Sequence, residues 1–548
     1  VVYDNTRVIV SSMEEVIETL MITLVLVVLV VFIFLQNVRA TLIPAVTIPV
    51  SLIGTFGAMA VLGFSINLLT LFGLILVIGI VVDDAIVVVE GCSRHIEDGM
   101  SPKDAAFKTM TEVSGPVIAT TLVLLAVFVP TSFMGGITGI LFQQFAITIS
   151  VATIFSSINA LTLSPAMCGV FLRKSSGKSN FVFRAFNYCM EKTTTGYYAT
   201  VKLAIRKSAI FVLLFIGMSA AAMWGFMSLP TGFVPQEDEG YTIVAVQLPD
   251  AASLQRTEAV MEEVNAIVGS TPGMKDYLTI TGYSLLDGAV APNMAFSIAF
   301  FEDWGDRPPS QHQNVIIGSI NQRLMGVLSA IGFAFPTPSL PGLGLTGGFS
   351  VMLQDRAGVG LEVLQQVSND FIADGVTQSA IGNMSTTFRA NVPQIFVDID
   401  REQVMNRGIP MSSVFDTMET YLGSTYINDF TLFNRVFKVK AQAGSQFRAN
   451  VADIGNLELQ TPNGEMTPLR GLIDVKDILG PQTITRYNLY PSVKVRGGQA
   501  PGYSSGQAMA VIADMAAQQL PASMGYEWTD MSYQEMTAAG GTTIIFAL

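Results

Sequence analysis

The sequence has 548 residues, of which 50% are hydrophobic and only 13% are charged, and its mean hydropathy is +0.49. This composition excludes a single water-soluble domain and is typical of membrane proteins. A net charge of −13, a pI of about 4.7 and the lack of a basic hydrophilic tract argue against a nucleic-acid-binding protein.

The chain opens on VVYDNTRVIV, which is polar and β-prone rather than a signal peptide, and it ends on the short apolar run TTIIFAL. We therefore expect both ends to be cuts through a longer protein. Residues 1–15 would end an N-terminal half outside the membrane, and residues 542–548 would begin a further, truncated span.

Six apolar segments are long enough to cross a bilayer, so we expect a polytopic α-helical membrane domain over residues 16–230. The predicted spans are 19–35, 42–62, 68–89, 116–133, 145–172 and 209–229. Prolines 44, 49 and 165 predict kinks within these spans. The basic residues follow the first, third and fifth spans, so these loops are predicted to be cytoplasmic. The segment 181–198 is predicted to be an interfacial helix or a tethering loop.

The third span carries two adjacent carboxylates, Asp83 and Asp84, about 22 Å from its start at Leu68 at the helical rise per residue. A carboxylate near the middle of a spanning helix costs about 2.5 to 3.5 kcal/mol on insertion scales. The pair therefore predicts a proton or ion relay. The alternatives are acids that cap a helix in a soluble core, or that face a polar cavity without moving protons.

The region from residue 231 onward alternates strands and helices and is predicted to lie on the outer side of the membrane. Residues 231–345 follow the βαββαβ order of a split βαβ, ferredoxin-like unit. A second such unit is predicted over 346–392 and 481–535, interrupted by an inserted α+β domain at 393–480.

The outer region is acidic, which favours cationic or zwitterionic amphiphiles through its summed field, although acidity for solubility alone is an equal alternative. It contains no cysteine and one histidine, His312, so it lacks the usual ligand sets for transition metals. We expect neither a metal site nor a cofactor.

The run GLILVIGIVVDDAIVVVE resembles the resistance-nodulation-division transporters, as do FLQNVRATLIPAVTIPVSLIGTF, GGITGILFQQFAITIS, YINDF, RYNLYPS and GYEWTDMSYQE. The resemblance covers essentially the whole chain and is strongest to the hydrophobe/amphiphile efflux branch, the AcrB-like multidrug pumps of Gram-negative bacteria. It implies a chain that runs from the second transmembrane helix to the opening of the eighth. The outer region then holds two periplasmic porter subdomains and a docking subdomain, the insert 393–480.

The resemblance also implies roles for individual residues. Asp83 and Asp84 match the family's proton-carrying pair, which pairs with a lysine on a later helix, whereas the heavy-metal branch has a small residue where Asp84 stands. Residues at or near the deep drug pocket are Leu278, Tyr283, Leu285, Phe296 and Ile298, and those at the outer cleft are Phe333 and Phe335. The segment Tyr283 to Asn293 matches a switch loop between the two sites, with Gly288, Ala289 and Asn293 as its members. Each pocket residue could equally be core, and the loop could be a plain hairpin.

The resulting hypothesis is a proton antiporter, not an enzyme, that exports amphiphilic small molecules. The resemblance implies a multi-pass protein of the bacterial inner membrane, in contact with its lipids. It also implies a homotrimer that works with a periplasmic adaptor protein and an outer-membrane channel. Two alternatives are a heavy-metal exporter and a non-pumping lipid- or sterol-sensing receptor. The scatter of Met274, Met294 and Met352 does not favour the metal exporter.

Overall fold

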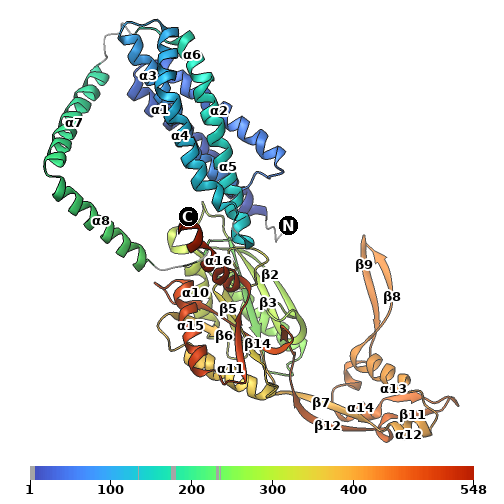
Figure 1. The fold of residues 1–548 in the computed structure, drawn as a ribbon. Helices are drawn as coiled ribbons and strands as arrows, with labels where there is room; N and C mark the ends of the chain where they lie inside the picture. Colours follow the sequence, from blue (N-terminus) through green and yellow to red (C-terminus); the bar gives the residue numbers. More distant parts are fainter. Residues whose placement is uncertain are drawn as a thin grey trace.

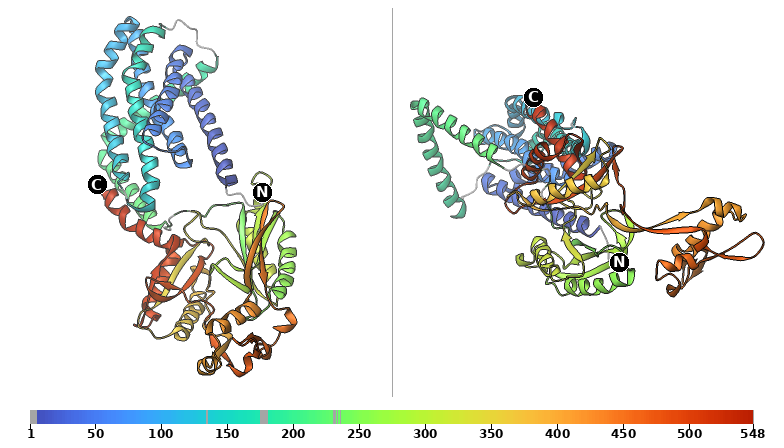
Figure 2. Two further views of the ribbon diagram at one scale, coloured as in Figure 1. Left: turned by 90° about the vertical axis from the view of Figure 1, so that its right-hand side faces the viewer. Right: turned by 90° about the horizontal axis from the view of Figure 1, so that it is seen from below.

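The computed structural model describes residues 6–547, except for residues 134, 175–180, 230, 231, 233 and 235. Apolar helices form a bundle at one end of the molecule, and two α+β units lie below it (Figure 1). Figure 2 shows the two units side by side, with an inserted unit extending away from the bundle. The expected combination of a polytopic helical part and a sheet-rich α+β part is confirmed.

Six helical segments in the described part of the chain are long and apolar enough to cross a membrane. They are α1 (Thr6–Leu35), α2 (Val38–Val61), α3 (Leu68–Glu97), α4 (Pro102–Thr131), α5 (Gly136–Leu161) with α6 (Leu163–Phe171), and α8 (Ser208–Ser228). Several extend beyond the apolar runs because a helix, once formed, adds flanking residues at little cost. The β-prone interpretation of the opening segment is therefore wrong from Thr6 onward, where α1 begins.

Prolines act differently in two of these helices. Helix α2 continues through Pro44 and Pro49 without a break, and a kink at these residues stays a prediction. The segment around Pro165 is instead interrupted at Thr162, whose φ of −122° and ψ of −65° separate α5 from α6. Since proline has no N–H to donate to the preceding turn, a break there is physically reasonable, and the prediction of a simple kink is wrong.

Helix α3 is the most enclosed single helix of the bundle and packs against α5, α4, α1 and α2. It approaches α4 closely at Gly91, where an added Cβ would lie 2.6 Å from Cγ2 of Thr109. Gly79, which precedes the acid pair by one turn, has no such neighbour within 4 Å among the described atoms. On the other side of the acid pair, an added Cβ at Gly73 would lie 3.5 Å from Phe145 on α5, so close packing occurs on both sides of the pair.

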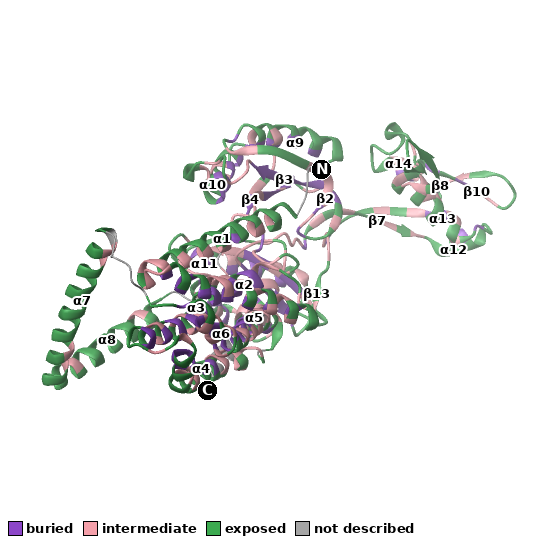
Figure 3. Ribbon diagram, turned by 90° about the horizontal axis from the view of Figure 1, so that it is seen from above, coloured by how far each residue is buried: buried purple, intermediate pink, exposed green. Residues whose placement is uncertain are grey.

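Helices α7 (Phe181–Arg206) and α8 stand apart from the bundle (Figure 1). The start of α7 contacts the end of α1, where Phe183 packs edge-on to Phe32 and Gln36 Nε2 donates to Asn187 Oδ1 at 2.6 Å. Helix α8 has no buried residue, and Figure 3 shows it exposed along its length. The interfacial helix expected over 181–198 is thus part of a longer helix, and its position in an interface remains a prediction.

The first α+β unit follows the predicted order of strands and helices. Its elements are β1 (Tyr241–Gln247), α9 (Leu254–Gly269), β2 (Met274–Ser284), β3 (Ala289–Phe301), α10 (Gln313–Leu324) and β4 (Ile331–Phe335). The antiparallel sheet has the order β2-β3-β1-β4. Because side chains alternate along a strand, Val244 and Val246 pack under α9 and α10, whereas Ile243 and Ala245 lie on the opposite face.

The second α+β unit repeats this arrangement from two separate parts of the chain. Its elements are β5 (Phe349–Asp355), α11 (Leu361–Gly375), β6 (Ile381–Ser385), β13 (Arg486–Tyr487), β14 (Tyr490–Gln499), α15 (Ser505–Gln519) and β15 (Met524–Trp528). Strand β14 pairs with both β5 and β6, and β15 pairs with β5, so the core order β6-β14-β5-β15 matches the first unit. Helix α16 (Asp530–Ala547) follows and leads back toward the bundle.

The inserted unit is connected to the second α+β unit by an antiparallel pair of strands, β7 (Val392–Ile399) and β12 (Ile473–Gly480), which we call the arm. The arm leads to a small core and to an exposed hairpin (Figure 1). Its further elements are α12 (Arg401–Asn406), α13 (Met411–Met418), the π-helical turn Glu419–Gly423, β8 (Thr425–Leu432), β9 (Arg435–Ala441), α14 (Ala452–Asn456), β10 (Glu458–Gln460) and β11 (Met466–Pro468). Short 3-10 turns occur at Pro309–Gln311, Ser445–Phe447 and Leu469–Gly471.

Candidate functional site

The acid pair lies within α3, and Asp84 is on the side of this helix that meets α5. Asp84 is half-buried, and its Oδ2 accepts a hydrogen bond of 2.9 Å from Ser156 Oγ on α5. Asp83 is exposed on the surface of the bundle. Neither carboxylate forms an ion pair within the described part of the chain. The two neighbouring acids therefore have different surroundings, as expected for residues about 100° apart on a helix.

Further polar groups continue from Asp84 across the bundle. Ser156 also lies 3.2 Å from the carbonyl oxygen of Val81, and Asn159, three residues later on α5, donates to Ser51 Oγ on α2 at 2.7 Å. All three side chains are buried. Buried polar groups persist only when they are hydrogen-bonded, so this strip gives Asp84 a polar environment inside an apolar bundle. The sequence analysis missed it, although the run FSSINA within a span was the available signal.

Six of the seven predicted pocket residues come together on the open face of the first sheet. They pack with Ile243, Ala245 and Leu286 as one apolar cluster, and they are Tyr283, Leu285, Phe296, Ile298, Phe333 and Phe335. The rings of Phe333 and Phe335 are 5.6 Å apart, and those of Tyr283 and Phe296 are 6.1 Å apart. Leu278 pairs with Ile298 in the sheet but lies outside the cluster and is 38% exposed.

The predicted switch loop is the end of the β2–β3 hairpin. Ser284 pairs with Ala289, so only residues 285–288 form the turn, with Gly288 at a φ of +65°. Asn293 is buried within β3 and donates to Leu248 O at 3.3 Å. The alternative of a plain hairpin describes this structure, and a switching motion stays a prediction.

The hairpin end is attached to the second α+β unit. Asp287 Oδ2 accepts from Ser284 Oγ at 2.6 Å, and its Oδ1 accepts from Thr387 Oγ1, while Arg496 on β14 donates to Leu286 O at 2.7 Å. These contacts join the turn to the facing sheet. A movement of one unit relative to the other must therefore strain or break them.

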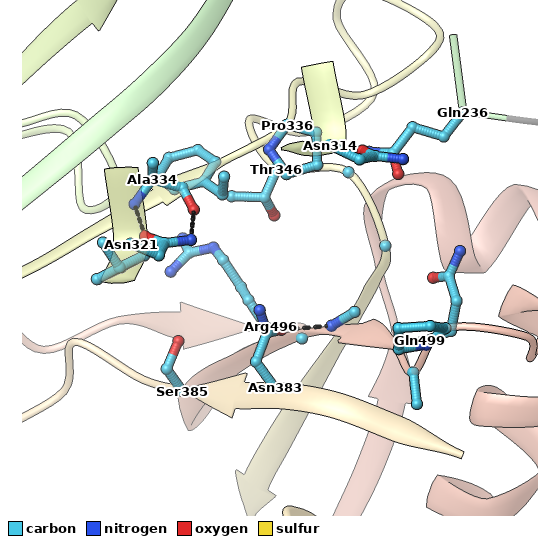
Figure 4. Close-up of a pocket in the computed structure, with 18 of the residues that line it drawn as sticks. Gln236, Asn314, Asn321, Ala334, Pro336, Thr346, Asn383, Ser385, Arg496 and Gln499 are labelled. Atoms are coloured by element: carbon cyan, nitrogen blue, oxygen red, sulfur yellow. Dashed lines mark hydrogen bonds between the residues drawn. The ribbon is translucent and has the colours of Figure 1, made fainter. Parts of the chain in front are cut away.

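A cavity of about 690 Å³ lies between the two units, next to the apolar cluster. Figure 4 shows Asn314, Asn321 and Ala334 on one side of it, and Asn383, Ser385 and Arg496 on the other. Phe333 and Phe335 contribute apolar surface to the same wall as Ala334. An apolar wall combined with a few polar groups is the usual composition of a small-molecule site.

Comparison with known proteins supplies the family. The model of the AcrB/AcrD/AcrF family matches residues 1–548. The chain belongs to this family. It is 35% identical over 556 residues to the multidrug export protein AcrF of Escherichia coli (strain K12), an alignment that covers the whole chain and 53% of that relative.

Other members of the family give similar alignments over the whole chain. The multidrug/solvent efflux pump membrane transporter MepB of Pseudomonas putida is 34% identical, and 52% of it is covered. The multidrug resistance protein MdtF of Escherichia coli (strain K12) is 34% identical, and 53% of it is covered. The chain thus spans about half the length of these curated relatives. The family and the six membrane-capable helices in the described part of the chain together identify the chain as part of a membrane protein.

Proposed function

We propose that this chain forms the proton-coupling and substrate-binding part of a pump that exports amphiphilic compounds in exchange for protons. The observation that carries the proposal is the Asp84 carboxylate, hydrogen-bonded to Ser156 inside a bundle of mostly apolar helices. A carboxylate at this depth is costly to insert, so its presence favours a role in ion movement.

In this proposal Asp83 and Asp84 take up protons from the outer side and release them to the cytoplasm. Asp83 is exposed on the bundle surface, so a cation on a membrane segment from outside this chain could contact it. Deprotonated acids would attract that cation and protonated acids would release it, which gives two arrangements of the bundle. Each proton that crosses 100 mV supplies about 2.3 kcal/mol for the change.

Substrate binding is proposed for the space between the two α+β units. The apolar cluster offers aromatic surface, and apolar contacts, unlike hydrogen bonds, require no fixed geometry. The cavity beside it is large enough for a drug-sized molecule. Few fixed polar contacts would allow compounds of different shape to bind, which is the basis of broad specificity. The hairpin end at residues 285–288 is attached to both units, so it is placed to respond when they move.

The proposed location is the bacterial inner membrane, with the α+β units in the periplasm. A homotrimer that engages a periplasmic adaptor and an outer-membrane channel is proposed from the family. The exposed β8–β9 hairpin supports this assembly, because its strands carry solvent-exposed apolar side chains such as Phe430 and Phe437, stacked at 5.5 Å. A long, exposed apolar hairpin is typical of a segment that another chain covers.

The test is the accumulation of a fluorescent amphiphile in cells without other pumps that express the protein with its natural flanking sequence. Asp84→Asn removes the titrating group at almost constant volume, so accumulation should rise to the level of cells without the protein. Glu90→Gln is the matched control, because Glu90 is an exposed acid on the same helix, just beyond the predicted span. Wild-type accumulation in the Asp84→Asn variant would refute the relay and favour a receptor.

A further inference from the structure

A single charged residue lines the cavity between the two α+β units. Arg496 lies on β14 and is only 9% exposed, and every other residue in the described lining of the cavity is uncharged. Figure 4 shows its side chain pointing from β14 into the cavity, toward the side formed by Asn321 and Ala334. A buried guanidinium is costly to desolvate, so a charge at this position is normally paired with an anionic group.

The strand direction explains why Arg496 faces the cavity. Val493 and Val495 point into the core of the second unit, so Lys494 and Arg496 share the opposite face of β14. The two cations differ in their partners. Lys494 Nζ forms an ion pair of 2.6 Å with Asp530 Oδ2, whereas Arg496 forms no ion pair with any residue that the structure describes.

Arg496 has donors to spare. A guanidinium carries five N–H donors in a planar fork, and the hydrogen bond to Leu286 O uses one of them. The nearby carboxylate of Asp287 is already engaged by Ser284 and Thr387. Burial lowers the pKa of Arg496, and the charges of Asp287 and Asp530 offset this only in part. The guanidinium is nevertheless charged at neutral pH, since arginine is the most basic of the ionisable side chains.

A second donor lies close by. Asn383 on β6 accepts a hydrogen bond from the backbone N–H of Gly498 with its Oδ1 at 2.7 Å, which leaves its amide NH2 as a donor beside the cavity. Phe333 and Phe335 line the facing wall. The cavity thus combines a buried cation, an amide donor and an aromatic surface within one space, an arrangement that suits a molecule with an anionic group and an apolar body.

We propose that Arg496 makes this cavity selective for amphiphiles that carry a carboxylate or sulfonate group, with the anionic group at Arg496 and the apolar body against Phe333 and Phe335. The inference rests on the proposed function and names its substrate class. It runs against the expectation from the acidic outer region, which favoured cationic or zwitterionic compounds. We expect Arg496 to determine the charge preference of the cavity because it is buried, whereas exposed acidic groups at a distance are screened by salt.

The experiment compares two dyes with one scaffold, anilinonaphthalene sulfonate and its sulfonate-free parent, phenylnaphthylamine. Cells without other pumps express the protein with its natural flanking sequence, as wild type or as Arg496→Gln, and the export of each dye is followed by fluorescence. Loss of a charge-assisted hydrogen bond should weaken the apparent affinity for the sulfonate dye by about tenfold or more. Export of the neutral parent should fall much less than export of the sulfonate dye, because only the hydrogen bond from Arg496 to Leu286 O affects it.

Two further variants separate recognition from structure. Arg496→Lys keeps the charge and should retain most export of the sulfonate dye. Lys494→Gln removes a cation from the same face of the same strand and should leave the preference between the dyes unchanged, because Lys494 is paired with Asp530.

The outcomes are distinct. Equal loss of both dyes in Arg496→Gln, or unchanged export of both at wild-type protein level, would overturn the inference and leave the proposed function standing. If the wild-type protein exports neither dye, both the proposed function and the inference fail.

Discussion

Replacing Asp238 by asparagine tests how the first α+β unit is anchored near the point where the chain leaves α8. Both oxygens of Asp238 face the guanidinium of Arg307, at 2.9 Å and 3.0 Å, and the backbone N–H groups of Gly240 and Gln313 donate to the same carboxylate. The side chains of Asp238 and Arg307 are only 14% and 4% exposed. The substitution leaves a buried guanidinium without its counter-charge.

Removing one partner of a buried, hydrogen-bonded ion pair lowers the free energy of unfolding by about 3 to 5 kcal/mol. We expect a loss in this range because both side chains are buried and share two hydrogen bonds. The double variant Asp238→Asn/Arg307→Met removes the stranded charge and places an apolar chain over Phe301, whose ring lies 5.3 Å from the guanidinium. More than half of the lost stability should return. Lys476→Gln, which removes an exposed ion pair with Asp474, should have no measurable effect.

The assay is urea unfolding of the purified protein in detergent, followed by Trp304 fluorescence. This indole is a local reporter because its Nε1 donates to Asp238 O at 2.9 Å. A loss below about 1 kcal/mol in the single variant, or a double variant as unstable as the single one, would refute the reasoning.

The ion pair between Asp238 and Arg307 also predicts that the stability of the fold depends on pH. Burial alone would raise the pKa of Asp238, but the hydrogen bonds and charge of Arg307, with the N–H groups of Gly240 and Gln313, hold the pKa below its ordinary value of 3.8. A lowered pKa in the folded state means that Asp238 stabilises the fold above pH 3.8 and loses this contribution as the pH falls through the lowered value. The stabilities of the wild type and Asp238→Asn should therefore converge only in strong acid.

Three further predictions concern other parts of the molecule. Gly91→Ala should lower the unfolding temperature, since its Cβ would lie 2.6 Å from a methyl group of Thr109, and adding Thr109→Ala should restore it. Asp287→Asn should change which compounds are exported more than the amount of protein in the membrane, because it loosens the hairpin end without touching a core. Shortening the hairpin formed by residues 425–441 should reduce trimers in native mass spectrometry while the monomer stays folded, and unchanged trimers would contradict its proposed role.

Periodicity alone was sufficient to predict most of the fold. The alternating strands and the helices between them reproduce both βαββαβ units, including the second one, which is split by an insertion of nearly ninety residues between β6 and β14. Apolar run length located the six membrane helices but not their ends. The ends depend on capping residues. Ser101, for example, accepts a hydrogen bond from Asp104 N, so α4 begins well before its apolar run.

The candidate sites were only partly predictable. Asp83 and Asp84 are visible in the sequence because charge is rare in an apolar span, but Ser156, the hydrogen-bond partner of Asp84, lies on another helix and is a common residue type. Arg496 was missed for a similar reason. One arginine in a strand is unremarkable until the fold places it, buried and without an ion-pair partner in the described chain, in the wall of a cavity.

The central claim is that proton movement through Asp83 and Asp84 drives export, and its most direct test is proton flux in vesicles. The purified protein with its natural flanking sequence is reconstituted with a pH-sensitive dye inside and an imposed pH gradient, and an amphiphilic substrate is then added. The account predicts substrate-dependent proton flux in the wild type and none in Asp84→Asn, with flux retained in Glu90→Gln. Equal flux in the wild type and Asp84→Asn would contradict it.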